Sequence, residues 1–350
     1  MSPALRLRAP AKLNLGLALV GTRPDGYHLL ESVFAPVAVY DELTLELGSG
    51  PGAIDLVCGP ALDPDLPEAV GTVPTGPENL VWRAARLFCD RTGLAAGIRI
   101  GLRKGIPAGA GLGGGSSDAA AVLRGLVALS GLPVEPAELA RWALALGADV
   151  PFFLAPEPAF VHGIGEHIER VGPLPELPVV LVNPGKTLAT ADVYRASDRL
   201  SAALTKNRAG STMRALSGLT QNRRDLVPAL RDLLINDLEP AARQLCPVVG
   251  RIAERLGRVG ALAVSMTGSG ATVFGVFDSE AAASDAAERL RSEESAEECA
   301  EGSAEESGEV GDGGASDEPE RCWVRATRVL GRGAGQVGGF EEFLGASPNG

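Results

Sequence analysis

The 350-residue chain has no run of 18 apolar residues, only five cysteines and only four lysines. Without such a run, no helix is long and apolar enough to cross a membrane. The cysteines are scattered, odd in number and form no C-x-x-C pair, so we expect reduced thiols and no cysteine-bound metal. Charges near Met1 interrupt any apolar signal segment. These features predict a cytoplasmic protein without a membrane partner.

Neither a basic stripe nor an aromatic platform is present, so we expect no nucleic-acid partner. The net charge of −12 comes from one segment, 292–320, which holds twelve acidic residues and no basic one. The other 32 acidic residues equal the 32 basic ones. The segment is rich in Glu, Ser and Gly, which predicts a disordered, solvated insertion; a binding segment for a basic partner is the alternative.

The length favours two domains, or one large one. Prolines at 173, 175 and 178 interrupt the pattern of predicted elements, so we place one domain at 1–172 and a second at 173–330, with a loose Gly-rich tail at 331–350. We expect strands at 5–19, 33–47, 54–57, 97–104, 159–171 (a hairpin), 179–182, 261–266, 271–277 and 322–329. We expect helices at 79–93, 116–130, 136–146, 191–200, 226–234, 248–256 and 279–291.

A glycine-rich loop is the most informative feature of the chain. It reads Pro107, Ala108, Gly109, Ala110, Gly111, Leu112, Gly113, Gly114, Gly115, Ser116, Ser117 and leads into an apolar helix capped by Ser116, Ser117 or Asp118. Glycine lets a ligand approach the main chain, and the helix start presents unpaired N–H groups and a positive dipole end. The loop therefore predicts a phosphate cradle for a nucleotide triphosphate.

Two familiar phosphate loops do not fit this sequence. The spacing of Gly109, Gly111 and Gly114 matches G-x-G-x-x-G, but Glu135, the nearest acidic candidate for a dinucleotide ribose, opens another helix. A Walker A loop needs Lys after its last Gly, where this chain has Ser116. A third pattern, Pro-x-x-x-Gly-Leu-Gly-x-Gly-Ser-Ser, fits from Pro107 to Ser117. A flexible linker is the alternative, but linkers seldom end in an apolar helix.

Four further segments carry chemically suitable side chains. Lys12 and Asn14 share one face of the first strand, and a compact ammonium suits a reacting oxygen better than a guanidinium; a solvated strand lysine is the alternative. Tyr27 and His28 follow a Gly turn, where they could hold a base. Asp149 follows a helix, where it is either a cap for the turn at Pro151 or a general base. The turn Thr267, Gly268, Ser269, Gly270 is either a plain hairpin or a cover for phosphates.

Together these segments resemble the galactokinase, homoserine, mevalonate and phosphomevalonate (GHMP) kinase superfamily, and within it the kinases of the non-mevalonate isoprenoid pathway. The resemblance covers about residues 3–290 and resumes at the last strand; the acidic insertion departs from the family's compact C-terminus. It implies an α+β fold of two domains: an N-terminal ATP-binding α/β domain with a left-handed βαβ unit, and a ferredoxin-like C-terminal domain.

The resemblance also implies the chemistry. ATP, with Mg²⁺ carried on it and no dedicated metal site, phosphorylates the 2-hydroxyl of a methylerythritol linked to cytidine diphosphate. Lys12 and Asp149 flank the acceptor hydroxyl, and residues 107–117 hold the ATP phosphates. The substrate contacts Asn14, Tyr27, His28, Tyr194 and the turn Thr267, Gly268, Ser269, Gly270. Alternatives are homoserine or mevalonate kinase activity, or a nucleotide-binding regulator without catalysis. A monomer or a homodimer fits equally.

Overall fold

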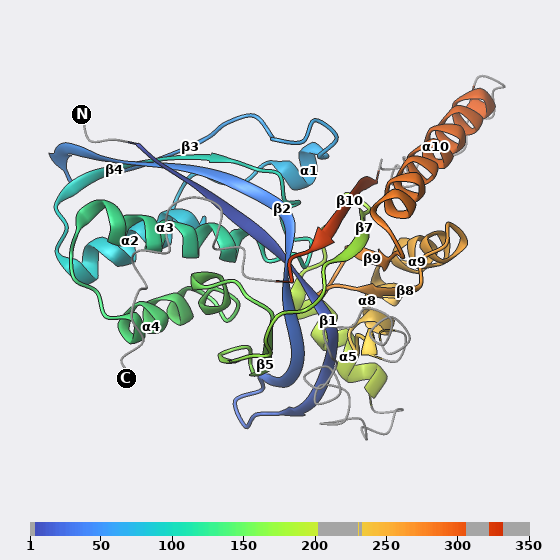
Figure 1. The fold of residues 1–350 in the computed structure, drawn as a ribbon, viewed down its shortest axis with the longest axis horizontal. Helices are drawn as coiled ribbons and strands as arrows, with labels where there is room; N and C mark the ends of the chain where they lie inside the picture. The colour runs from blue at the N-terminus through green and yellow to red at the C-terminus, as the bar shows by residue number, and fades with distance from the viewer. Residues whose placement is uncertain (1–3, 202–229, 231–232, 306–321, 332–350) are drawn as a thin grey trace.

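A computed structural model of the chain describes residues 4–201, 230, 233–305 and 322–331. Its strands form one continuous mixed sheet whose main path runs β3-β4-β2-β10-β7-β9-β8. Two groups of helices lie against different parts of this sheet, with α2, α3 and α4 in one group and α5, α8, α9 and α10 in the other (Figure 1). This division matches the two halves that the sequence predicts.

The N-terminal half is built on a long antiparallel hairpin, β1 (Leu5–Thr22) with β2 (His28–Pro51). Strand β4 (Ala96–Arg103) pairs with β2 and, in parallel, with β3 (Ile54–Cys58), so β3, α2 (Leu80–Thr92) and β4 form the expected βαβ unit. Asn79 caps α2 through Val81 N–H, and Gly93 ends it in the left-handed region. The short helix α1 (Glu68–Gly71) precedes α2.

The glycine loop joins β4 to α3 (Gly114–Ser130), as predicted. The predicted cap is wrong, because α3 begins at Gly114 with Gly113 as its N-cap and without a side-chain cap. Ala119, Val122, Leu123 and Leu126 are buried on the predicted apolar face. This face packs in one core with α2, the strands and α4 (Pro136–Leu146), whose predicted bounds are those observed.

The C-terminal half has the ferredoxin-like order. Strands β7 (Leu177–Asn183), β8 (Ala263–Met266), β9 (Val273–Val276) and β10 (Trp323–Val329) are antiparallel and lie in the order β10-β7-β9-β8. Helices α5 (Thr190–Ser201), α8 (Glu239–Leu245) and α9 (Val248–Arg258) lie between β7 and β8 in the chain, and α10 (Glu280–Glu305) lies between β9 and β10. This is the split β-α-β-β-α-β arrangement.

The β1–β2 hairpin connects the two halves. Its far end reaches down beside β5 (Ala159–Gly163) and α5 (Figure 1), where β5 pairs with β2 and with β6 (His167–Arg170). Leu17, Leu19 and Leu30 of the hairpin are buried in the same core as Val193 of α5. Val37 also pairs with Val329 of β10, which makes the sheet continuous.

Several sequence predictions need correction or lie outside the described residues. Residues 292–305 continue helix α10, so the disorder predicted from 292 is wrong for this part, while 306–321 lie outside the described residues. Helix α8 was not predicted, and most of the helix predicted at 226–234 and the tail beyond 331 are also outside. The domain boundary at 172, between β6 and β7, stays a prediction.

Candidate active site

The glycine loop takes a backbone shape that only glycine adopts easily. Gly109, Gly111 and Gly113 have φ of 63°, 76° and 72°, in the left-handed region. A Cβ at Gly111 would overlap the carbonyl oxygen of Thr267, and one at Gly113 would lie 2.9 Å from the Phe153 ring. The loop is therefore a tightly packed cradle at the start of α3, whose first N–H groups remain available to an anion.

One polar atom at the start of α3 supports an anion site there. The Ser117 hydroxyl is buried, and it has no hydrogen-bond partner among the described residues. Buried polar groups are normally paired in native proteins, so such an atom marks a place for a ligand or ion. Together with the glycine cradle, it makes residues 107–117 fit the phosphates of ATP.

The turn at residues 267–270 packs directly on the glycine loop. The Thr267 hydroxyl has one proton to donate, which reaches either Asn14 Oδ1 (3.2 Å) or the Gly111 carbonyl (3.4 Å), and it accepts from Asn14 N–H (3.1 Å). Asn236 Nδ2 donates to the carbonyls of Met266 and Gly268, both at 2.8 Å. The turn is thus more than a hairpin, because it fastens the C-terminal half to the cradle.

Lys12 and Asp149 meet beside this loop. Lys12 Nζ lies 3.6 Å from Asp149 Oδ2, donates to Asn14 Oδ1 at 2.6 Å, and lies 4.5 Å from the centre of the Phe34 ring. The Lys12 backbone N–H donates to the Leu112 carbonyl at 2.9 Å, which fixes the strand to the loop. Burial lowers the pKa of Lys12, and the neighbouring charge of Asp149 opposes this shift.

Asp149 lies in the turn between α4 and the short helix η1 (Pro151–Leu154). Helix η1 has no side-chain cap, so capping does not account for this carboxylate. Its side chain is 33% exposed, which leaves it reachable from the cavity that it lines. A carboxylate beside a buried ammonium and a phosphate cradle can receive a proton from a bound hydroxyl.

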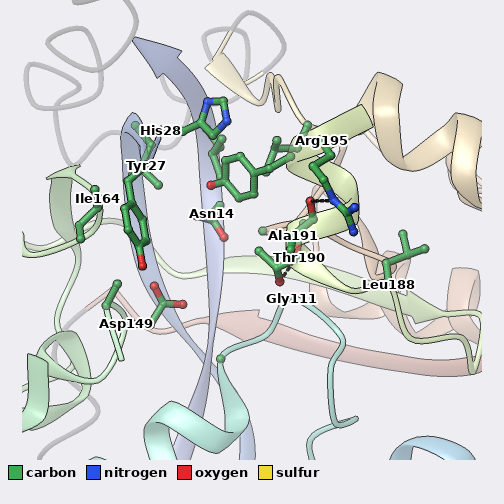
Figure 2. A pocket seen from close by; sticks show the side chains of 18 of the residues that line it. Asn14, Tyr27, His28, Gly111, Asp149, Ile164, Leu188, Thr190, Ala191 and Arg195 are labelled. Atoms are coloured by element: carbon green, nitrogen blue, oxygen red, sulfur yellow. Dashed lines mark hydrogen bonds between the residues drawn. The ribbon is translucent and has the colours of Figure 1, made fainter. Parts of the chain in front are cut away.

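Aromatic side chains gather further along the same cavity (Figure 2). His28 stacks on Tyr194 of α5, with ring centres 4.9 Å apart and 27° between the planes, and His28 Nε2 lies 3.3 Å from Asp198 Oδ2. Burial raises the pKa of the Tyr194 hydroxyl to about 12. Tyr27 is 61% exposed, and in Figure 2 its hydroxyl points toward Asp149. These rings can form the walls of a site for a flat base.

One cavity of about 730 Å³ unites most of the predicted residues. Lys12, Asn14, Tyr27, His28, Gly109, Gly111, Gly113, Asp149, Tyr194, Gly268 and Ser269 line it. The remaining predicted residues, Pro107, Ala108, Ala110, Leu112, Gly114, Gly115, Ser116, Ser117, Thr267 and Gly270, do not line it. Leu112 and Thr267 are fully buried, so their side chains serve the packing of the loop and the turn.

Sequence reasoning missed several residues of the site. Ser32 accepts from Asn14 Nδ2 at 2.8 Å, and Phe34 lies under the Lys12 ammonium. Thr190 Oγ1 and Ser269 Oγ lie 3.0 Å apart in the lining of the cavity. Asp41, Lys104 and Asp118 form a buried charged cluster at the glycine loop. Only the scarcity of lysine could have drawn attention to Lys104, one of four in the chain.

Within the described ranges no group of His, Cys, Asp and Glu side chains could hold a metal ion. The helices of these ranges include none with the length and apolar character needed to span a membrane.

The geometry defines a class of enzyme, and comparison with known proteins agrees with it. The sequence profile of the GHMP kinases N terminal domain matches residues 79–156, and that of the GHMP kinases C terminal domain matches residues 202–296. Two solved structures share the fold. The homoserine kinase from Cytophaga hutchinsonii has 19% sequence identity and a TM-score of 0.63, and the match covers 95% of this chain and 96% of that one. The L. major mevalonate kinase has 15% identity and a TM-score of 0.62, and the match covers 95% of this chain and 99% of that one. The fold is that of the GHMP kinases, which are ATP-dependent small-molecule kinases.

Other relatives are more similar. The 4-diphosphocytidyl-2-C-methyl-D-erythritol kinase of Geobacter sp. (strain M21) is 43% identical over 286 residues, covering 82% of this chain and 94% of the relative. The kinase of the same name from Desulfitobacterium hafniense (strain Y51) is 39% identical, and the match covers 78% of this chain and 87% of the relative. A crystal structure of 4-(cytidine 5'-diphospho)-2C-methyl-D-erythritol kinase has 34% identity and a TM-score of 0.67, covering 93% of this chain and all of that one. This chain belongs to the 4-diphosphocytidyl-2-C-methyl-D-erythritol kinase family of GHMP kinases.

Proposed function

We propose that this enzyme transfers the γ-phosphoryl group of ATP to the 2-hydroxyl of 4-diphosphocytidyl-2-C-methyl-D-erythritol, a step of the non-mevalonate route to isoprenoid precursors. The observation that carries the proposal is the single cavity that joins the glycine loop, the Lys12–Asp149 pair and the aromatic walls around His28. The homoserine and mevalonate kinases share only the fold at 15–19% identity.

Residues 107–117 hold the ATP phosphates in this proposal. The open N–H groups at the start of α3 and the buried Ser117 hydroxyl suit an anion, and the turn at 267–270 closes over them. Mg²⁺ supplies neutralisation of the phosphate charge and enters with ATP. Among the described residues no cluster offers it a ready ligand set. Chelating Mg²⁺ abolishes turnover in this scheme.

Lys12 and Asp149 act on the acceptor. Asp149 receives the proton of the 2-hydroxyl while the oxygen of that hydroxyl bonds to the γ-phosphorus. The bond from the γ-phosphorus to the oxygen that bridges to the β-phosphate breaks, which releases ADP. Lys12 neutralises charge beside the reacting oxygens, and Asn14, held by Ser32 and Thr267, orients the substrate. Phosphoryl transfer requires mainly such positioning and charge stabilisation.

The cytosine lies at the other end of the cavity, against Tyr27, His28 and Tyr194. Tyr27 is exposed and free to close on one face of the base, while α5 supports Tyr194 through its stack on His28. Stacking on an aromatic ring contributes about 1–3 kcal/mol per base. The acceptor's nucleotide part would thereby place its alcohol beside Asp149.

A substrate panel with the purified protein tests the function. ADP formation with 4-diphosphocytidyl-2-C-methyl-D-erythritol, and none above background with mevalonate or homoserine, is the expected result. Turnover of mevalonate or homoserine instead would assign a different GHMP activity. ATP binding without turnover of any acceptor would identify a regulator. Oligomeric state, a monomer or a homodimer, is measured in the same preparation by light scattering.

A further inference from the structure

Asp41, Lys104 and Asp118 form a buried charged cluster, here called the loop clamp, that takes no part in the proposed chemistry. Each is at most 4% exposed. Lys104 Nζ donates to Asp41 Oδ2 and, at 3.0 Å, to Asp118 Oδ2. Asp41 belongs to β2, Lys104 follows β4, and Asp118 lies in the second turn of α3, so the cluster joins three elements.

The clamp holds both ends of the glycine loop. Asp41 Oδ1 accepts the N–H groups of Gly105 (2.7 Å) and Ile106 (2.9 Å), where the loop leaves β4. Asp118 fixes the other end through Lys104, and a Cβ at Gly114 would lie 3.3 Å from Asp41 Oδ2. No member of the clamp lines the cavity, so any influence on the nucleotide must act through the loop.

The charges of the clamp balance only when one carboxyl group keeps a proton. Two carboxylates and one ammonium would leave a net negative charge buried beside a phosphate site, which is costly. Burial and the neighbouring charge of Asp41 raise the pKa of Asp118 well above its ordinary value, against the opposing effect of Lys104. The pKa of Lys104 is raised by both carboxylates, so the ammonium keeps its charge.

We propose that Asp41, Lys104 and Asp118 are positioning residues for the nucleotide, which hold the two ends of the glycine loop at the spacing a triphosphate requires. The proposal rests on the proposed function in one respect, that the loop binds ATP. Pre-organising a loop in its bound shape raises affinity for the ligand it contacts. The clamp therefore governs the affinity for ATP and leaves that for the acceptor unchanged.

The test measures binding of a non-hydrolysable ATP analogue and, separately, of cytidine diphosphate by calorimetry on the full chain. Lys104→Met and Asp41→Asn are expected to weaken analogue binding by about tenfold or more, the equivalent of 1.4 kcal/mol, with cytidine diphosphate binding within about twofold of the unaltered protein. Asp118→Ala is expected to weaken analogue binding similarly, and Asp118→Asn to restore most of it, because an amide resembles the protonated carboxyl group.

The neighbouring ion pair provides a matched control. Arg103 and Glu42 are opposite each other on the same two strands, one residue further along, and their exposed side chains lie 3.6 Å apart. Arg103→Met and Glu42→Gln should leave both affinities within about twofold, since exposed pairs contribute little.

Three results would overturn the proposal. The first is unchanged analogue binding in folded Lys104→Met or Asp41→Asn. The second is an equal loss of affinity for the ATP analogue and for cytidine diphosphate. The third is failure of Asp118→Asn to restore the analogue affinity that Asp118→Ala loses. If Lys104→Met does not fold, the Asp41→Asn and Asp118 variants decide the matter. Failure of the proposed function is separate, because it would appear as absent acceptor turnover by the unaltered protein.

Discussion

The ammonium of Lys12, on the first strand, lies 3.6 Å from the carboxylate of Asp149, which follows the fourth helix. Lys12 is buried, whereas the Asp149 side chain is 33% exposed toward the cavity. The pair thus combines a charge sheltered from water with a proton acceptor that a substrate can reach.

The first prediction concerns Asp149, the proposed proton acceptor. Asp149→Asn keeps the shape of the side chain but cannot take a proton, so we expect kcat to fall by about 10²–10⁴-fold. Binding of an ATP analogue should change by less than about threefold, because the glycine loop is untouched. Asp90→Asn, in an exposed pair with Arg86, is the control. Near-normal kcat in Asp149→Asn would remove Asp149 from the mechanism.

The Lys12 ammonium should limit activity at high pH. Burial lowers its pKa below the ordinary 10.5, so the charge is lost as pH rises through the lowered value, and kcat should fall at a pH below 10.5. A rate profile from about pH 7 to about pH 11 measures this. A profile that stays flat up to pH 10.5 would contradict the assignment.

The same shift predicts a gain in stability when Lys12 is removed. Between the lowered folded pKa and 10.5 the unfolded chain binds more protons, so the free energy of unfolding rises with pH there. Below that window the buried ammonium costs stability. Lys12→Met should therefore unfold at an equal or higher temperature at pH 7, while kcat falls sharply. A clearly lower unfolding temperature would show that the pairing with Asp149 outweighs burial.

Gly111→Ala should disrupt ATP binding through a clash. Gly111 has φ of 76°, and an added Cβ would overlap the Thr267 carbonyl. Gly131, the C-cap of α3, has φ of 64° but open space around it, so Gly131→Ala carries the same backbone strain without the clash. That strain is about 1–2 kcal/mol. ATP-analogue binding should fall at least tenfold more in Gly111→Ala than in Gly131→Ala, and equal losses would mean that the clash is relieved.

Tyr27→Ala should weaken binding of the cytidine substrate and leave binding of ATP unchanged. The loss of one stacking ring should raise KM for that substrate by about tenfold, without a change in KM for ATP. Stability should hardly change, since the side chain is 61% exposed. Tyr194→Phe, which keeps the ring that stacks on His28, is the control and should leave KM within about twofold. An equal KM in Tyr27→Ala would place the base elsewhere.

Local signals carried much of the fold. Helix α4 and the region of α2 follow from apolar periodicity and from end signals such as Asn79 and Gly93, which act through neighbouring residues. The helix start after the glycine loop was misjudged, because Asp118, predicted as a cap, instead joins Lys104 in a contact that local pattern does not reveal. Helix α10 continues to Glu305, although the composition of that segment predicts disorder.

The sequence by itself determined the glycine loop with its flanking strand and helix, since these depend on residue type and short spacing, and it singled out Lys12 and Asp149 as candidates through the family resemblance. Only the tertiary structure decided that these groups share a cavity, that Thr267 fastens the turn to the loop while Asn236 holds the turn, and that Asp41 and Lys104 are buried together. These contacts join residues far apart in the chain, and packing of the β1–β2 hairpin against both halves of the sheet brings them into register.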